Sequence, residues 1–263
     1  MISTSKTTIA LVGGGGAMGR MLGSFWTDAG YTVNSIDRRE DPSGTLALDS
    51  CDLEEGIDGA DIVVISVPVT ALCEVAARIA PHMRHGQLLV DVTSVKMRPM
   101  QWMEECYAGP VIGAHPLFGP NPAREFMRVP LVRGLRSSEE NAAQAETLFT
   151  SIGCAVFWTT AREHDEGVAL AQSLNFTVSA AFFATLAANP QARPFLTPSF
   201  TRHLEAARKH LTQDTAMFCE FTSENPMYQD VLCRYRETLD RAVSGGLAGM
   251  AEDAAVWYSG GAM

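Results

Sequence analysis

The glycine-rich stretch from Ile9 to Arg20, IALVGGGGAMGR, constrains the fold of this chain more than any other feature. A short apolar run leads into four consecutive glycines, and a segment typical of a helix follows. The spacing Gly14-x-Gly16-x-x-Gly19 is that of the dinucleotide fingerprint. Its first glycine permits a tight turn, its second lets a pyrophosphate approach the backbone, and its third lets the helix pack closely on the strand. The stretch therefore predicts a strand, a phosphate-binding turn and a helix whose free N–H groups hold the pyrophosphate.

The residues on both sides of the glycines agree with this prediction. We expect a strand over residues 7–12, an amphipathic helix over residues 18–29 that Gly30 ends, and a second strand over residues 32–36 that leads into Asp37. In this fold an acidic residue at the end of the second strand, about twenty residues after the glycines, binds the ribose hydroxyls. The alternative is a strand, turn and helix that bind no ligand. In that case the agreement of the flanking strands, the helix and Asp37 with the fingerprint would be a coincidence.

Asp37 predicts NAD as the cofactor, because its carboxylate accepts hydrogen bonds from both ribose hydroxyls and would repel a 2′-phosphate. Arg38 and Arg39 leave NADP open, since either guanidinium would suit a 2′-phosphate if Asp37 rotated away. The predicted cofactor-binding residues are Gly14, Gly16, Ala17, Met18, Gly19, Asp37, Arg38, Val67 and Pro68.

Strand-like and helix-like segments alternate up to about residue 160, and only helical patterns follow. Further strands are expected over residues 61–67, 88–91, 111–114, 131–133 and 155–159, with helices over residues 70–80, 98–107 and 138–152. Apolar, β-branched runs separated by helices indicate a parallel sheet covered on both faces. Later helices are expected over residues 164–188, 202–211, 215–222, 226–243 and 247–258. We therefore predict an α/β protein with a Rossmann-type parallel sheet domain over residues 1–160 and an all-helical dimerisation domain over residues 161–263.

The predicted helix over residues 164–188 is apolar around most of its circumference. A helix of this kind needs burial on several sides, which a small helical domain alone does not offer. This pattern predicts a homodimer that pairs through the helical domain.

Composition excludes several other classes of protein. The net charge of −10 and the isoelectric point near 5.0 argue against a nucleic-acid partner, and the N-terminal MISTSKTT lacks the features of a signal peptide. No apolar stretch approaches the length of a membrane span, so we expect a cytoplasmic protein with no membrane partner. The six cysteines show no metal-ligand spacing, so we expect no metal site and reduced, mostly buried thiols.

Three polar clusters are candidates for chemistry. Asp91 opens the sequence DVTSVK, in which Ser94 and Lys96 would present a hydroxyl and a cation to an anionic substrate. The equally weighted alternative is a polar loop at the end of a strand. In GAHPLFGP, His115 follows the next strand and is suited to accept a proton from a substrate hydroxyl as hydride leaves the same carbon. A single histidine is otherwise more often structural.

The third cluster is Glu163-His164-Asp165, at the start of the helical region. His164 either begins the helix, with Asp165 serving the helix dipole, or points into the cleft between the domains. The sequence alone does not favour one of these two interpretations.

Over nearly its full length the chain resembles the prephenate/arogenate (cyclohexadienyl) dehydrogenases of tyrosine biosynthesis. The matching motifs, in order, are VGGGGAMGR, VISVPV, DVTSVK, GAHPLFGP, EHD and LTPSFTRHLEAARKHLTQD. The resemblance implies oxidative decarboxylation of a small cyclohexadiene to a phenol with NAD or NADP, by a Rossmann domain and a helical dimerisation domain. It also implies that His115 removes the ring hydroxyl proton and that Ser94 bonds to that histidine and to substrate. Arg202 would bind the ring carboxylate, Lys96 would help to anchor the substrate, and His164 would lie near the site.

One departure concerns the helix after EHD, where relatives carry a histidine and this chain has Asn175 and Phe176. The phenyl ring removes a hydrogen-bonding group from the substrate region, which leaves prephenate, arogenate and 4-amino-4-deoxyprephenate open as substrates. A β-hydroxyacid dehydrogenase or imine reductase would share the glycine turn but would not be expected to carry HPLFGP beside TSVK. A dinucleotide-binding protein without turnover is the remaining alternative, and His115, Ser94 and Arg202 argue against it.

Overall fold

The computed structural model describes residues 7–38, 46–47 and 53–259. Arg39 and Cys51 lie outside the described residues. The chain divides into two compact units, an N-terminal unit Met1–Val168 and a C-terminal unit Ala169–Met263. The division therefore falls inside the helix expected over residues 164–188, whereas the sequence predicted it between residues 160 and 161.

The N-terminal unit is built around an eight-stranded sheet with the order β3-β2-β1-β4-β5-β6-β7-β8. The strands are β1 (Thr8–Val12), β2 (Thr32–Asp37), β3 (Leu46–Ala47), β4 (Ile62–Ile65), β5 (Leu88–Asp91), β6 (Val111–Ala114), β7 (Arg128–Arg133) and β8 (Ala155–Thr159). Neighbouring strands pair in parallel with one exception, so the predicted α/β class with a Rossmann-type sheet is confirmed.

The exception is β7, which pairs antiparallel with β6, for example Gly113 with Val132. The sequence analysis expected one parallel sheet. A parallel pair needs a long crossover, usually a helix, but the segment from His115 to Met127 contains only the short 3-10 turn Arg124–Phe126. The chain therefore returns in the opposite direction. A full crossover through α5 (Glu139–Thr150) then places β8 parallel to β7.

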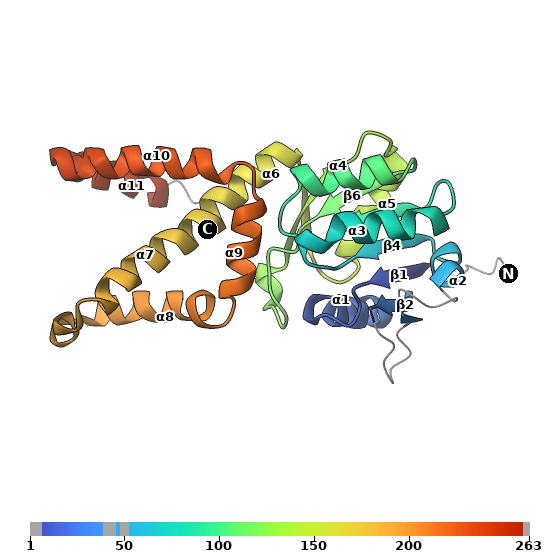
Figure 1. Ribbon diagram of the computed structural model, residues 1–263, viewed down its shortest axis with the longest axis horizontal. Coiled ribbons are helices and arrows are strands. Elements are labelled where there is room, and N and C mark those ends of the chain that lie inside the picture. Colours follow the sequence, from blue (N-terminus) through green and yellow to red (C-terminus); the bar gives the residue numbers. More distant parts are fainter. Residues whose placement is uncertain (1–6, 39–45, 48–52, 260–263) are drawn as a thin grey trace. The chain divides into compact units, whose positions relative to one another are not determined.

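Helices cover both faces of the sheet, as Figure 1 shows for the N-terminal unit. Alternate residues of each strand point to opposite faces. Ile9 and Leu11 pack with α1 (Ala17–Asp28) and α5, whereas Ala10 and Val12 pack with α2 (Leu53–Asp58), α3 (Val69–Ile79) and α4 (Met97–Cys106). The Nε1 of Trp26 on α1 donates a 2.9 Å hydrogen bond to the Leu148 carbonyl on α5, which joins two helices of one face.

The last helix of this unit is α6 (Ala161–Val168), which follows β8. It continues through a π-helical segment, Ala169–Leu174, into α7 (Asn175–Ala187). The run Ala161–Ala187 is, by length and composition alone, long and apolar enough to cross a membrane, and its most apolar 18-residue window has a mean hydropathy of 1.3. This corrects the expectation that no stretch approaches that length, because three helical segments join into one run of 27 residues.

The described residues of the C-terminal unit form helices joined by short turns, with no strand among them. Its helices are α7, α8 (Pro198–Thr212), α9 (Thr215–Glu224), α10 (Tyr228–Arg241) and α11 (Leu247–Ser259). The expectation of mostly buried thiols is wrong for the described cysteines, since Cys73, Cys219 and Cys233 are exposed and Cys154 is buried. The three exposed cysteines lie on helices that are only partly covered by the rest of the protein, so apolar neighbours in the sequence do not imply burial.

Candidate active site

The carboxyl edge of the sheet collects most of the predicted site residues. β2, β1, β4, β5 and β6 run in the same direction, so the segments that follow them meet at one edge. In open α/β sheets ligands bind in the crevice at this edge, where the strand order reverses. Here the order reverses at β1, which lies between β2 and β4.

The glycine turn follows β1 and is held against the neighbouring strands. The backbone N–H groups of Gly13 and Gly14 donate to the Ile36 carbonyl at 2.7 and 3.2 Å. Gly13 has a φ of +86°, and a Cβ there would lie 2.3 Å from the Ser66 carbonyl oxygen. The left-handed residue of the turn is therefore Gly13, one position before the fingerprint.

The three fingerprint glycines differ in what a side chain would meet. A Cβ on Gly14 would lie 2.1 Å from Ser35 Oγ, and one on Gly19 would lie 2.3 Å from the Gly13 carbonyl oxygen. A Cβ on Gly16 would meet the protein only at 3.3 Å, and Gly16 is exposed. The protein itself requires the first and third glycines, whereas the second leaves open space above the turn.

That open space adjoins the start of α1. Gly16 is the N-cap of this helix and supplies no side-chain cap, so the first N–H groups, including those of Ala17 and Met18, have no partner within the helix. Unpaired N–H groups and the positive end of a helix dipole suit a phosphate. These residues therefore fit the pyrophosphate of a dinucleotide.

Asp37, at the end of β2, is tied to the same turn. Its Oδ2 accepts a hydrogen bond from the Gly15 N–H at 2.9 Å, and its Oδ1 accepts one from the Arg38 N–H at 2.7 Å. These bonds fix the carboxylate beside the turn and leave lone pairs free for further donors. Arg38 is exposed, and Val67 and Pro68 follow β4 at the same edge, with Pro68 at the N-cap of α3.

The segment after β5 contains a buried ion pair. Lys96 Nζ lies 2.5 Å from Asp91 Oδ2, and neither side chain is exposed. Thr93 binds the same oxygen through its N–H at 3.0 Å and through its hydroxyl. The expectation that Lys96 presents its charge to a substrate is thus not met in the structure, because its ammonium is directed to Asp91. The acid at the buried end of β5, five residues before a lysine, is the sequence signal that could have predicted this pair.

Gly113 on β6 makes room for the Asp91–Lys96 pair. A Cβ at this position would lie 2.8 Å from Lys96 Cδ, 2.7 Å from Met100 Sδ and 3.3 Å from Asp91 Oδ1. Packing therefore requires a glycine at this position of the GAHP motif, since any side chain there would displace Lys96.

Asp165 on α6 binds the start of α4. Its Oδ1 accepts from the Lys96 N–H at 2.6 Å, and its Oδ2 accepts from the Met97 N–H at 2.9 Å. A carboxylate at a helix N-terminus satisfies orphan N–H groups and favours the helix dipole. A dipole role for Asp165 was one of the two interpretations of its sequence position, and the structure places that role on α4 rather than on its own helix.

The two histidines of the predicted site lie together. His115 Nδ1 is 3.0 Å from His164 Nε2, and His164 Nδ1 is 2.8 Å from Asp165 Oδ1. Both residues are 5% exposed, and their ring centroids are 5.1 Å apart. Within the described part of the chain, no group forms a hydrogen bond with His115 Nε2.

Burial keeps both rings neutral. It is the largest influence on the pKa of His115, which burial, the His164 ring and the Lys96 ammonium together hold well below 6.5. Burial also lowers the pKa of His164, against the opposing hydrogen bond to Asp165. A neutral, buried imidazole with a free ring nitrogen is suited to accept a proton.

Two other predicted site residues form no hydrogen bond with His115 among the contacts of the described residues. Ser94 is half-buried, and its hydroxyl forms no hydrogen bond with the described residues; the Nδ1 of His115 is bonded to His164 instead. Arg202 is exposed on α8 in the C-terminal unit, where its Nη2 lies 3.3 Å from Ser199 Oγ. Its guanidinium is free to pair with a carboxylate.

Phe176 is a core residue of the C-terminal unit. It is 7% exposed, stacks on Phe218 with ring centroids 5.1 Å apart, and lies edge-on to His210 at 6.2 Å. His210 Nε2 is buried and has no hydrogen-bond partner among the described residues. The phenyl ring at this position thus packs within an aromatic cluster of its own unit.

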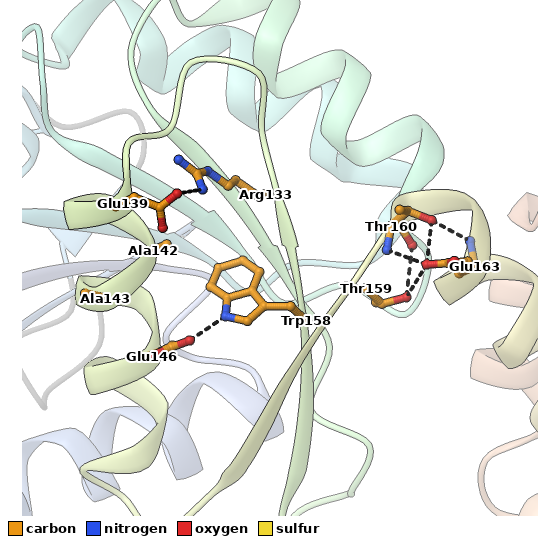
Figure 2. Close-up of a pocket in the computed structure, with 9 residues that line it drawn as sticks. All are labelled: Arg133, Glu139, Ala142, Ala143, Glu146, Trp158, Thr159, Thr160 and Glu163. Carbon is orange, nitrogen blue, oxygen red and sulfur yellow. Dashed lines mark hydrogen bonds and ion pairs between the residues drawn. The ribbon is translucent and has the colours of Figure 1, made fainter.

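A hollow of about 480 Å³ lies between α5 and β8, and none of the predicted site residues lines it (Figure 2). Three carboxylates line it, and each has a partner in the described structure. Glu139 pairs with Arg133 at 2.5 Å, Glu146 accepts from the Trp158 indole, and Glu163 accepts from the Thr160 hydroxyl at 3.0 Å. The carboxylates make this hollow unsuited to an anionic substrate.

Comparison with known proteins identifies similar sequences and folds. Residues 31–127 match the family model described as "Prephenate dehydrogenase, nucleotide-binding domain". The T-protein of Haemophilus influenzae is 26% identical over 250 residues, which cover 92% of this chain and 63% of the T-protein. The 4-amino-4-deoxyprephenate dehydrogenase of Streptomyces pristinaespiralis is 29% identical over 195 residues, which cover 65% of this chain and 60% of that relative.

Among solved structures, the prephenate dehydrogenase from A. aeolicus in complex with hydroxyphenyl propionate and NAD+ has a TM-score of 0.75. It is 17% identical and covers 97% of this chain and 96% of the solved chain, so the likeness shows a shared fold. The present chain spans about three fifths of the length of the two curated relatives.

Proposed function

We propose that this chain, which is related to the prephenate and arogenate dehydrogenases, catalyses the NAD-dependent oxidative decarboxylation of a cyclohexadiene, prephenate or arogenate, to a phenol. The observation that carries the proposal is the state of His115. It is a buried, neutral histidine with an unbonded Nε2, at the sheet edge that also holds the glycine turn. The sequence match supplies the substrate class.

The cofactor-binding residues proposed are those of the glycine turn, with Ala17 and Met18 at the pyrophosphate and Asp37 at the ribose. Bound NAD would supply the acceptor for the hydride of the hydroxyl-bearing ring carbon, and the loss of carbon dioxide would then make the ring aromatic. His115 Nε2 accepts the hydroxyl proton as the hydride leaves and returns it to the same oxygen as the phenol forms. General-base help of this kind contributes roughly a hundred- to ten-thousand-fold.

Arg202 is proposed to bind the ring carboxylate, because its guanidinium is exposed and its two parallel donors match a planar carboxylate. Ser94 is proposed to contact the substrate hydroxyl, since its own hydroxyl follows β5 and is unbonded within the described chain. For Lys96 we propose a different task from the one first expected. It neutralises Asp91 within the core and keeps a positive charge close to His115.

The test is an assay of nicotinamide absorbance with prephenate, arogenate and 4-amino-4-deoxyprephenate offered in parallel. Reduction of NAD with prephenate or arogenate supports the proposal. The third compound represents a second candidate function, favoured by the 4-amino-4-deoxyprephenate dehydrogenase of Streptomyces pristinaespiralis, which is 29% identical to this chain. Cofactor binding without reduction by any of the three would overturn both.

The assembly proposed is a homodimer in the cytoplasm that pairs through the C-terminal unit. Apolar side chains of this unit are widely exposed, among them Leu247, Val256 and Trp257, which are 67%, 71% and 61% exposed. Only 28% of the most apolar window of Ala161–Ala187 is buried. A second copy of the chain would cover this apolar surface, so that no membrane is needed to bury it. A stable monomer at micromolar concentration in light scattering would contradict the dimer.

A further inference from the structure

We propose that Asp165 and His164 are positioning residues that fix the ring tautomer of His115, with its proton on Nδ1 and its lone pair on Nε2. This inference rests on the proposed function of His115 as the proton acceptor. It concerns a different property of the molecule, namely which of the two ring nitrogens is able to accept. One hydrogen-bonded relay joins the side chains of Asp165, His164 and His115.

Asp165 sets the direction of the hydrogen bonds in this relay, because its carboxylate oxygens can only accept hydrogen bonds. Its carboxylate accepts from the backbone N–H groups of Lys96 and Met97 at 2.6 and 2.9 Å and is completely buried. The backbone donors hold its orientation. The nitrogen of His164 that faces Oδ1 at 2.8 Å must therefore carry a proton.

His164 passes this constraint to the second ring. A neutral imidazole carries one N–H, and the bond to Asp165 places it on Nδ1. His164 Nε2 is then an acceptor, so the atom 3.0 Å from it, His115 Nδ1, must donate. An imidazolium carries an N–H on both nitrogens and would not fix which nitrogen accepts. Burial lowers the pKa of both rings, so both are neutral at neutral pH and the assignment holds.

His115 is the last residue of this relay, and its lone pair is on Nε2. Without a partner at Nδ1, either nitrogen can carry the proton, and a ring with Nε2–H cannot serve as the base at that atom. The relay thus keeps His115 in the reactive form before substrate arrives. After proton transfer, the Nδ1–H of the imidazolium still has His164 as acceptor, and the buried Asp165 carboxylate offsets the new charge.

The charged groups near the relay are compatible with the tautomer assigned to each ring. The Lys96 ammonium raises the cost of a second proton on either ring, and Asp91 neutralises the ammonium at 2.5 Å. Lys96 and Met97 supply the backbone donors from the start of α4, so three elements, β6, α4 and α6, hold the relay together.

The decisive experiment is nitrogen NMR of the full chain labelled with 15N-histidine, at a pH above 7 and without substrate or cofactor. We expect His115 to show a protonated Nδ1 and an unprotonated Nε2. His164→Leu should leave the fold intact and shift His115 toward the Nε2–H tautomer, whereas His85→Leu, at an exposed position, should change nothing. An Nε2–H tautomer in the wild type, or an unchanged His115 in His164→Leu, would overturn the inference.

This readout does not depend on turnover, so it fails separately from the proposed function. Kinetics supply the second measurement. His164→Leu should lower kcat by roughly a hundred- to ten-thousand-fold, the contribution of a general base, with little change in the KM for NAD. His164→Gln should restore much of the loss, because its amide oxygen can accept from His115 Nδ1. Equal kcat values for the folded Leu and Gln variants would also contradict a positioning role.

Discussion

His115 Nδ1 and His164 Nε2 lie 3.0 Å apart although the two residues are 49 positions apart in the sequence. One ring follows the last residue of β6, and the other lies on α6. The contact between α6 and the start of α4 through Asp165 brings the second ring to the first. The proton acceptor of the proposed reaction therefore depends on a helix that comes after the whole sheet in the chain.

Replacing His115 should abolish most turnover and leave cofactor binding nearly intact. For His115→Asn we expect kcat to fall by roughly a hundred- to ten-thousand-fold. In the wild type, activity requires the neutral ring, so it should decline as pH falls through the pKa of His115, which lies well below 6.5. Steady-state rates across pH, with NAD binding followed by fluorescence, check both parts. A variant that keeps the rate or the acid limb would make His115 structural.

Stability should fall on mild acidification. The folded-state pKa values of His115 and His164 are both lowered, whereas unfolded histidine titrates near 6.5. The unfolded chain therefore binds more protons below that value. The stabilisation is complete above about pH 6.5 and is lost as pH falls toward the folded-state pKa values, by up to about 1.4 kcal/mol per pH unit for each ring. Urea unfolding between about pH 7.5 and pH 5 measures this slope, which His115→Asn should reduce.

Lys96→Met should strongly destabilise the N-terminal unit, because it leaves the Asp91 carboxylate buried without its cation. Breaking a buried pair in this way costs about 3–5 kcal/mol. The matched control is Lys209→Met. The Lys209 side chain is exposed and pairs with the half-buried Asp214 at 3.5 Å, so this ion pair should contribute about 0–1 kcal/mol. Chemical denaturation of both variants makes the comparison. Equal losses would show that Lys96 contributes no more than a surface charge.

Arg202→Gln should raise the KM for the cyclohexadiene far more than the KM for NAD. The reason is the loss of a charge-assisted pair with the ring carboxylate, worth about 1.5–3 kcal/mol, or roughly ten- to a hundredfold. Arg208→Gln on the same helix is a suitable control, since Arg208 pairs with Glu205 at 3.5 Å on the surface. A fall in kcat with an unchanged KM would place Arg202 in a different role.

NAD should be preferred over NADP, because Asp37 is held beside the glycine turn by hydrogen bonds from Gly15 and Arg38. In that position its carboxylate repels a 2′-phosphate. The KM values of the wild type for the two cofactors test this, and Asp37→Ala should narrow the difference between them. A lower KM for NADP than for NAD would refute the preference and would direct attention to Arg38.

Local patterns in the sequence determined much of the N-terminal unit. The strands at residues 88–91, 111–114 and 155–159 occur where the apolar, β-branched runs predicted them, and the glycine turn follows β1 as expected. Such features depend on neighbours within a few residues, so periodicity and turn chemistry reveal them. Proton-accepting chemistry at His115 was likewise proposed from its position at the end of a strand.

Only the tertiary structure decided which groups meet. Lys96 looked like a substrate ligand, but burial beside Asp91 makes it an internal ion pair. His164 became the partner of His115, β7 reversed its direction for lack of a crossover helix, and the long apolar helix begins inside one compact unit and ends in the other. These outcomes depend on contacts between distant segments and on the cost of burying charge, neither of which the local sequence pattern records.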